Sequence, residues 1–206
     1  MLERVMALLS ESADRESFFK RIALFLPTMD DRYQLIKKAY DVAEKEFENR
    51  FRDNGDRYFE HLRAVALILI DYLRIKDHNL IVAALLHDIV EDIPEWTIKR
   101  VKLEFGVEVA KLVEWLTKPA QEFPQKEERD KAYHKRFDSA PREFFLIKLP
   151  DRLHNMITLW GIKGKDYQEK KARKIEETKR YYLPFAERHL ILLHELEEAI
   201  ENLEKQ

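Results

Sequence analysis

Three short stretches of this chain carry side chains of the kind that bind a metal ion. They are His61 in the stretch YFEHL, the pair His87-Asp88 in AALLHDIVED, and Asp151 in IKLPDRLHNM. Two imidazoles and two carboxylates form a nitrogen and oxygen donor set without sulfur, which suits a divalent ion such as manganese, iron or zinc. The sequence therefore predicts one metal site built from three separate segments.

Two further carboxylates, Glu91 and Asp92, follow the His-Asp pair. If this region is helical, Glu91 lies one turn beyond His87 and Asp92 lies one turn beyond Asp88, so that each pair shares a helix face. Acids placed one turn beyond metal ligands are typical of a site that binds an ion and activates a water molecule beside it. The spacing favours hydrolytic chemistry.

Each of these residues also has an ordinary structural explanation. A single buried histidine such as His61 is more often a core residue than a metal ligand. The polar run from His87 to Asp92 directly follows the apolar residues 83–86, and burying such groups unpaired would cost on the order of several kcal/mol. Asp151-Arg152 could be an exposed ion pair. The remaining histidines are expected to be structural or exposed: His78, His134, His154, His189 and His194.

Composition limits the classes of protein that need to be considered. The chain has 206 residues, 45% hydrophobic and 37% charged, which fits one domain with a core of its own. A formal net charge of −2 excludes a globally basic nucleic-acid binder, and we expect neither DNA nor RNA as a partner. With 0 Cys there is no disulfide framework, no thiol nucleophile and no Cys-ligated zinc. We expect a cytoplasmic protein without a membrane segment, and a homo-oligomer stays open.

Apolar residues at helical spacing fill most of the chain and predict an all-α bundle, in which ligands come from several helices. Pro150 should kink its helix just before Asp151, because proline removes one backbone hydrogen bond. Loops are expected at 52–57 and 118–126. The expected helices cover residues 2–26, 31–51, 58–72, 79–92, 95–105, 107–117, from Ser139-Ala140-Pro141 to an end at Gly161 and Gly164, 166–186 and 188–204.

The metal-binding stretches resemble a known family. His61, His87-Asp88 and Asp151 are similar to the signature of the HD-domain metal phosphohydrolases. Four blocks in order narrow the resemblance to the hydrolase domain of RelA/SpoT-type proteins, over roughly residues 27–190; they are AALLHDIVED, FGVEVAKLVEWLTK, IKLPDRLHNM and ARKIEETKRYYLPFAER. Residues 1–26 then form an N-terminal helical extension, and residues 27–206 form an HD-type domain resembling the stand-alone small alarmone hydrolases.

The resemblance implies an activity and roles for individual residues. The family removes the 3′-pyrophosphate from (p)ppGpp in a manganese-dependent reaction, so the implied products are GDP or GTP and pyrophosphate. By the same resemblance, His61, His87, Asp88 and Asp151 bind the metal, and Glu91 and Asp92 form the catalytic acidic pair. The implied substrate-binding residues are Arg52, Asn155 and Arg173.

The chain departs from the family pattern at three positions. Asp53 stands where a second basic residue is usual, Leu62 stands in place of a proline, and Pro150 stands in place of an alanine. Several alternatives remain open. They are hydrolysis of ppApp in an antitoxin role, removal of the 2′-phosphate of NADPH, and a non-catalytic alarmone-binding protein, which would be expected to have lost Glu91 or Asp92.

Overall fold

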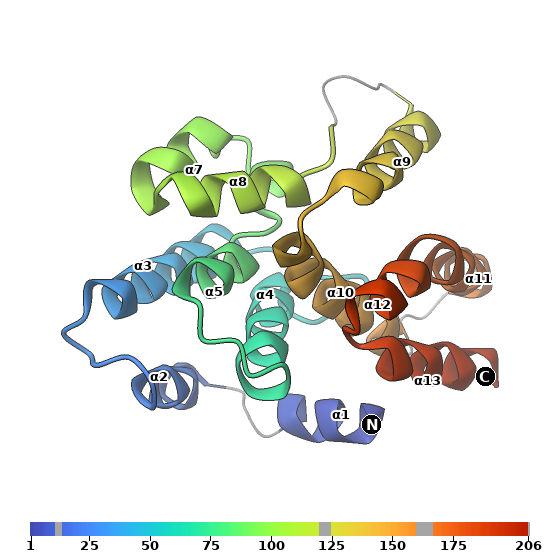
Figure 1. Cartoon of the computed structure of the whole chain (residues 1–206), viewed down its shortest axis with the longest axis horizontal. Helices are drawn as coiled ribbons and strands as arrows, with labels where there is room; N and C mark the ends of the chain where they lie inside the picture. Colours follow the sequence, from blue (N-terminus) through green and yellow to red (C-terminus); the bar gives the residue numbers. More distant parts are fainter. Residues whose placement is uncertain (11–13, 120–124, 160–166, 206) are drawn as a thin grey trace.

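The computed structural model describes residues 1–10, 14–119, 125–159 and 167–205, and these residues form a bundle of α-helices (Figure 1). The only pairing of extended backbone among them is an isolated bridge between Phe51 and Arg57. The expected all-α fold is confirmed. The α-helices are α1 Leu2–Ser10, α2 Arg15–Ala23, α3 Asp31–Glu46, α4 Tyr58–Leu67, α5 His78–Leu85, α6 Ile89–Asp92, α7 Ile98–Phe105, α8 Val107–Leu116, α9 Lys126–Lys135, α10 Arg142–Ile157, α11 Tyr167–Glu177, α12 Leu183–His189 and α13 Leu193–Glu204.

Helices α4, α5 and α10 form the centre of the bundle. Residues 61–67 of α4, 80–85 of α5 and 144–154 of α10 are buried without interruption. A helix that is buried on all sides needs mostly apolar residues, and these segments have them apart from a few buried polar groups such as Arg63 and Arg152. The three helices pack against one another, and each carries or adjoins a predicted metal ligand. The polar groups of the site therefore lie inside the apolar core.

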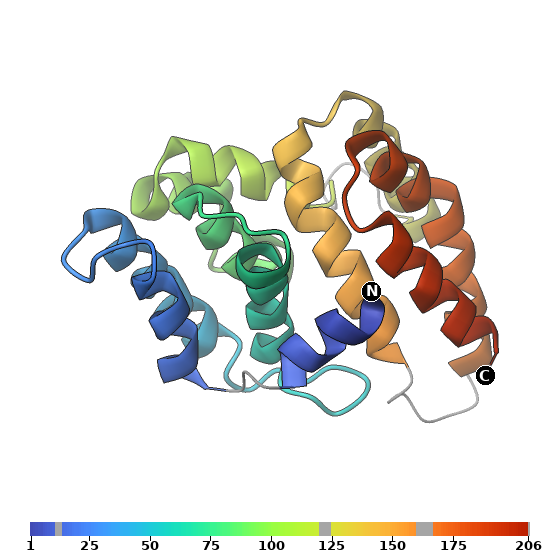
Figure 2. The same ribbon diagram turned by 60° about the horizontal axis from the view of Figure 1, so that its bottom comes forward.

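The other helices cover this centre in two groups. Helices α3 and α8 pack on α5, and α7 packs on α8, whereas α12 and α13 pack on α10 (Figure 1). Helix α1 crosses in front of the central helices near α13, as Figure 2 shows. Leu2, Val5, Phe18 and Ile22 are buried in the common core, so α1 and α2 pack onto the rest of the chain. The domain boundary at residue 27 stays a prediction.

The expected single helix over residues 79–92 is wrong, because the chain turns at residues 86–88 between α5 and α6. Leu86 has φ −109° and ψ 7°, and Asp88 has φ −103° and ψ 0°, which depart from regular helix geometry. The apolar pattern alone cannot reveal this turn. Glu91 and His87 are therefore not joined by one regular helical turn, and the expectation that they share a helix face on that basis is also wrong.

Helices expected as single units elsewhere are divided. Residues 2–26 form α1 and α2, and residues 166–186 form α11, a π-helical turn over Thr178–Tyr182, and α12. Residues 58–72 end in a π-helical turn over Ile68–Tyr72. Helix α10 continues through Pro150 for seven more residues. Gly161 and Gly164, expected to end it, lie outside the described residues.

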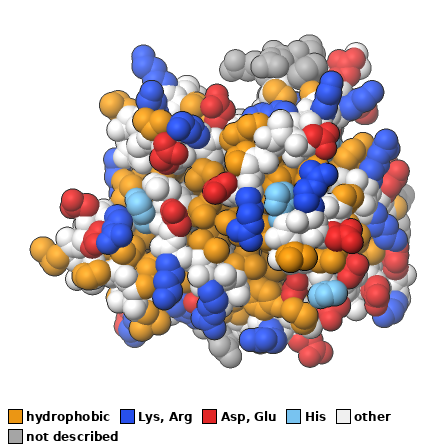
Figure 3. All heavy atoms as spheres, in the orientation of Figure 1, with side chains coloured by type: hydrophobic (Ala, Val, Ile, Leu, Met, Phe, Trp, Pro, Cys, Tyr) orange, Lys and Arg blue, Asp and Glu red, His pale blue; other side chains and the backbone are white. Residues whose placement is uncertain are grey.

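The surface shows no large field of one charge on the face drawn in Figure 3, where cationic and anionic side chains alternate among apolar ones. Within the described ranges, no helix combines the length and the apolar character needed to cross a lipid bilayer.

Candidate metal centre

The four predicted ligands converge in the centre of the bundle. His61 lies on α4, His87 and Asp88 lie in the turn after α5, and Asp151 lies on α10. Nε2 of His61 is 3.2 Å from Oδ1 of Asp151 and 3.9 Å from Oδ2 of Asp88. Nε2 of His87 is 3.2 Å from Oδ2 of Asp88 and 3.8 Å from Oδ1 of Asp151. Donor atoms from three segments of the chain therefore surround one point.

The hydrogen bonds of His87 leave one ring nitrogen available to an ion. Its Nδ1 lies 2.8 Å from the carbonyl oxygen of Ala84, which can only accept, so Nδ1 donates and Nε2 is the nitrogen that a proton or an ion can occupy. Nε2 is buried and has no hydrogen-bond partner. Burial disfavours the charged imidazole, but Asp88 and Asp151 outweigh it and raise the pKa of His87 to about 9. Carboxylates that attract a proton this strongly also attract a divalent cation.

His154 holds the ring of His61 in place. The two Nδ1 atoms are 2.9 Å apart, and Nδ1 of His154 also lies 3.1 Å from the guanidinium of Arg52. Because arginine only donates, Nδ1 of His154 must accept, and His61 must then donate from its own Nδ1. Nε2 of His61 is left as a lone pair directed at the two carboxylates. Burial lowers the pKa of His61 to about 4.

Asp151 uses its two oxygens differently. Oδ2 forms an ion pair of 2.8 Å with Nζ of Lys148, which is itself buried and lies over the ring of Tyr133. Oδ1 accepts a hydrogen bond of 2.6 Å from the amide of Asn155 and faces the two histidines. Burial opposes ionisation of this carboxyl, but Lys148 and the histidines hold its pKa well below the usual range. Asp151 therefore presents one anionic oxygen to the predicted metal site.

Asp88 is held by a tyrosine that the sequence did not single out. The hydroxyl of Tyr58 donates a hydrogen bond of 2.7 Å to Oδ2 of Asp88. Three of the predicted ligands, His61, His87 and Asp88, have donor atoms that all lie within 4.8 Å of one another and could hold a metal ion. Partners of this kind fix ligand orientation and tune metal affinity.

The acidic pair lies at the edge of this cluster. Asp92 is half-buried, and its pKa is raised by burial first and then by the neighbouring carboxylates of Asp88 and Glu91. Glu91 is exposed, and its Oε2 accepts a hydrogen bond of 3.3 Å from the backbone of Lys118. The pair thus combines one carboxyl suited to proton exchange with one that faces the solvent.

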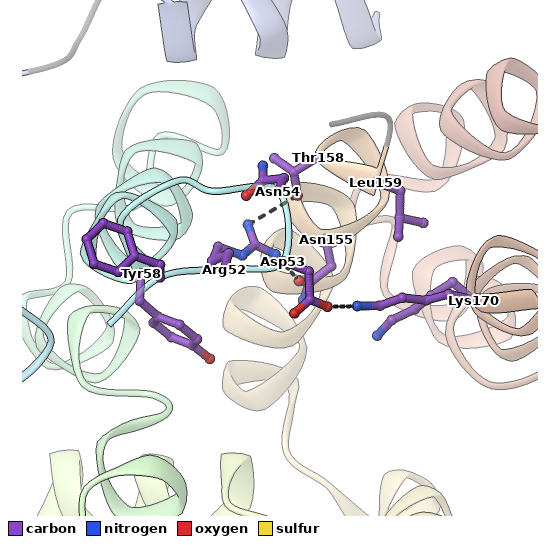
Figure 4. A pocket seen from close by; sticks show the side chains of 10 residues that line it. Arg52, Asp53, Asn54, Tyr58, Asn155, Thr158, Leu159 and Lys170 are labelled. Atoms are coloured by element: carbon purple, nitrogen blue, oxygen red, sulfur yellow. Dashed lines mark hydrogen bonds and ion pairs between the residues drawn. The ribbon is translucent and has the colours of Figure 1, made fainter. Parts of the chain in front are cut away.

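A pocket next to the ligands is lined by the 52–57 loop, α10 and α11 (Figure 4). The loop turns at Gly55, whose φ of 91° favours glycine, and its ends are tied by a hydrogen bond of 2.8 Å between Arg52 and Asp56. The Arg52 guanidinium donates to Asn155 at 2.5 Å and to Thr158 at 3.1 Å. Arg52 therefore bridges the loop to α10 beside the ligand Asp151.

Asp53, at the position where the related pattern has a cation, pairs with Lys170 of α11 across this pocket (Figure 4). The positive charge at this edge of the pocket thus comes from α11. Lys174, one turn further along α11, also lines the pocket. Helical spacing places both amines on one face.

The predicted substrate residues do not all meet. Arg52 and Asn155 lie together in the pocket of Figure 4, whereas Arg173 lines a separate cavity beside Lys118 and Glu177. Sequence reasoning missed Tyr58, His154, Lys148 and the lysines of α11. His154 and Lys148 could have been found from their spacing. Each lies three residues from Asp151, which places all three near one face of a helix.

Imidazole nitrogens and carboxylate oxygens gathered in the core of a helical bundle are typical of all-α proteins that bind a metal ion. Residues 39–191 match the family described as HD domain, which is about three quarters of the chain. This chain belongs to the HD-domain family.

Several curated proteins are similar to it. The bifunctional (p)ppGpp synthase/hydrolase SpoT of Escherichia coli K12 is 34% identical over 192 residues, which are 91% of this chain and 26% of that protein. The guanosine-3′,5′-bis(diphosphate) 3′-pyrophosphohydrolase of Aquifex aeolicus is 38% identical over 156 residues, 74% of this chain and 21% of that protein. The chain thus spans about a quarter of the length of these relatives.

A solved structure has the same fold. It is a metazoan ortholog of SpoT described as hydrolysing ppGpp, with a TM-score of 0.67 and 24% sequence identity, covering 82% of this chain and 94% of that one. At this identity the likeness concerns the fold. The similar arrangement of helices agrees with the HD-domain family assigned from the sequence.

Proposed function

We propose that this chain is a metal-dependent pyrophosphohydrolase that removes the 3′-pyrophosphate from (p)ppGpp, giving GDP or GTP and pyrophosphate. The observation that carries the proposal is the buried, partnerless Nε2 of His87, which faces two carboxylates and a second imidazole. A buried polar atom without a partner needs an explanation, and a divalent ion supplies it. The curated relatives, named as hydrolases of this type, indicate the reaction.

The ion we propose is Mn²⁺, held by His61, His87, Asp88 and Asp151. Nitrogen and oxygen donors without sulfur suit manganese. Lys148 and Asn155 keep one oxygen of Asp151 directed at the site, and His154 does the same for Nε2 of His61. When bound, the ion supplies Lewis-acid polarisation of a phosphoryl oxygen and lowers the pKa of water.

The chain's own residues supply proton transfer and positioning. A carboxyl with a raised pKa, such as Asp92, is suited to take a proton from the attacking water and return it to the leaving ribose oxygen. Glu91 helps to place that water. The water oxygen bonds to phosphorus as the bond between the 3′-oxygen and phosphorus breaks, and the 3′-oxygen takes up the proton to become a hydroxyl.

Substrate contacts come from the pocket of Figure 4 and its neighbour. Asn155 orients the nucleoside or ribose, and Arg52 with Lys170 and Lys174 presents positive charge to the phosphates. Arg173 reaches phosphates from the adjoining cavity. We assign the activity to a domain of residues 27–206 and describe residues 1–26 as its N-terminal helical extension.

The test is incubation of the purified, manganese-loaded chain with ppGpp, ppApp and NADPH in parallel, with products separated by anion exchange. The proposal expects GDP and pyrophosphate from ppGpp at a higher kcat/KM than for either other substrate. Preferred turnover of ppApp or release of phosphate from NADPH would reassign the substrate. Binding of ppGpp without turnover would show a non-catalytic alarmone-binding protein.

A further inference from the structure

Tyr58, the first residue of α4, contacts both a predicted metal ligand and a member of the acidic pair. Its hydroxyl donates a hydrogen bond of 2.7 Å to Oδ2 of Asp88. The same hydroxyl also forms a hydrogen bond with the side chain of Asp92. A phenol carries one hydrogen atom and can donate only one hydrogen bond at a time. The two carboxyl groups therefore share a single donor.

The position of this hydroxyl is fixed by the ring and the backbone of Tyr58. The ring stacks on Phe47, with the two centroids 4.9 Å apart and an angle of 17° between the planes. It also meets the ring of His61 edge-on, with centroids 5.9 Å apart. The backbone amide of Tyr58 donates a hydrogen bond of 2.9 Å to the carbonyl oxygen of Arg50. A phenol held by packing and by its backbone presents its hydroxyl at a defined point.

Asp92 is less firmly placed by its own helix. It is the last residue of α6, which has only 4 residues and continues into extended backbone at Ile93. Its backbone amide donates a hydrogen bond of 2.9 Å to the carbonyl oxygen of Asp88. This bond fixes the backbone of Asp92 but not the direction of its carboxyl group. A side-chain contact from the neighbouring α4 can supply that direction.

Tyr58 also faces the region where the substrate is expected. Its side chain lines the pocket of Figure 4 together with Arg52 and Asn155. In this view the ring extends away from the 52–57 loop. The hydroxyl thus lies where the pocket, the predicted metal ligands and the acidic pair meet.

We propose that Tyr58 is a positioning residue for the hydrolysis, whose hydroxyl holds the carboxyl group of Asp92 in place beside Asp88. A group that takes a proton from an attacking water has to lie within hydrogen-bonding reach of that water. A donor that both carboxyl groups share, carried on a fixed ring, sets the spacing between them. This role rests on the proposed function, because it concerns the residue that transfers the proton.

The test separates this role from simple support of Asp88. Tyr58→Phe removes the hydroxyl and keeps the ring that stacks on Phe47. If Tyr58 served Asp88 alone, the variant would bind Mn²⁺ more weakly and regain normal kcat at saturating Mn²⁺. We expect kcat to stay lower by about 10–100-fold at saturating Mn²⁺, because a displacement of about 1 Å in a reacting group has effects of this size. Normal kcat under these conditions would overturn the proposal.

The Michaelis constant and a control variant show that the loss is specific. KM for ppGpp should change by less than about threefold, since Tyr58 acts on proton transfer rather than on binding. Tyr72→Phe is the matched control, because it removes a hydroxyl that donates to the buried carboxylate of Glu195 at the other end of this helical segment. It should keep normal kcat and KM. Circular dichroism of both variants checks the fold.

A double-mutant cycle identifies the residue through which Tyr58 acts. In a chain that already carries Asp92→Ala, Tyr58→Phe should lower kcat little further, because its partner is gone. Independent losses, in which the two factors simply multiply, would overturn the proposal.

Failure of this role can be told apart from failure of the proposed function. If the unmodified chain turns over no ppGpp, the proposed function fails. Denaturant unfolding of the same four chains then still reports the contact between Tyr58 and Asp92. Additive losses of stability would show that the two side chains are not coupled and would overturn the placement of Asp92 by Tyr58, whereas non-additive losses would support it.

Discussion

The side-chain amide of Asn155 donates a hydrogen bond of 2.6 Å to Oδ1 of Asp151. The same side chain accepts a hydrogen bond of 2.5 Å from Arg52 of the 52–57 loop. Asn155 thus connects the 52–57 loop, which lines the proposed substrate pocket, directly to the predicted metal ligand Asp151. We therefore expect metal binding and substrate binding to depend on each other.

Asn155→Ala should lower the affinity for Mn²⁺ by about 10–100-fold, because loss of a partner that orients a ligand has effects of this size. Metal titration followed by calorimetry measures it. Thr158→Val is the matched control, since Thr158 contacts Arg52 but is not bonded to Asp151. Equal affinity in both variants would show that Asn155 does not position the ligand.

His61→Ala and Asp151→Ala should each abolish stoichiometric metal binding. Both residues belong to one compact set, and removing one ligand from such a set costs much of its affinity. Elemental analysis of purified protein is the measurement, with His194→Ala as control because His194 is exposed and far along the chain in α13. Full occupancy in the two ligand variants would refute the ligand assignment.

Glu91→Gln combined with Asp92→Asn should keep fold and metal but reduce turnover by at least about a hundredfold, the lower range for loss of a general acid and base. Both groups lie at the edge of the ligand cluster. Circular dichroism, metal content and turnover are compared with the unmodified chain. Near-normal turnover in the double variant would remove the acidic pair from the mechanism.

Asp53→Asn should lower KM for ppGpp by up to about fivefold, the effect of about 1 kcal/mol for a surface ion pair. The substitution frees Lys170 and removes a carboxylate that repels the substrate. Asp56→Asn, in the same loop but bonded to Asn54, is the control. A KM equal to that of the control would mean that Asp53 does not restrain Lys170 during binding.

Lys148→Met should reduce the free energy of unfolding of the metal-free chain by about 3–5 kcal/mol, because it leaves the buried Asp151 carboxylate without its cation. Denaturant titration measures the loss. Adding Asp151→Asn to this variant should recover part of it, since the unpaired charge is then gone. A second substitution that only lowers stability further would argue against the ion pair as the cause.

The sequence was informative about the centre of the fold because α4, α5 and α10 are mostly apolar and several of their few polar residues lie at the site. His61, His87, Asp88 and Asp151 could be selected on that contrast. The turn at residues 86–88 could not be predicted, because Leu86 is as apolar as the helix before it and only its backbone angles differ.

The partners of the ligands were harder to find than the ligands themselves. Tyr58 and Lys170 look like ordinary residues of helical segments, and their roles depend on which helices meet. Asp53 was noted only as a departure, and its pairing with Lys170 required knowledge of how the loop lies against α11. Long-range charge pairing of this type leaves no periodic signal in a single sequence.

The central claim is that a metal ion at His61, His87, Asp88 and Asp151 supports release of pyrophosphate from ppGpp. The most direct measurement is pyrophosphate release by the chain freed of metal and then titrated with Mn²⁺. We expect no turnover without the ion, recovery of turnover as one ion per chain is bound, and no recovery in His61→Ala. Turnover that is independent of Mn²⁺, or that His61→Ala retains, would contradict it.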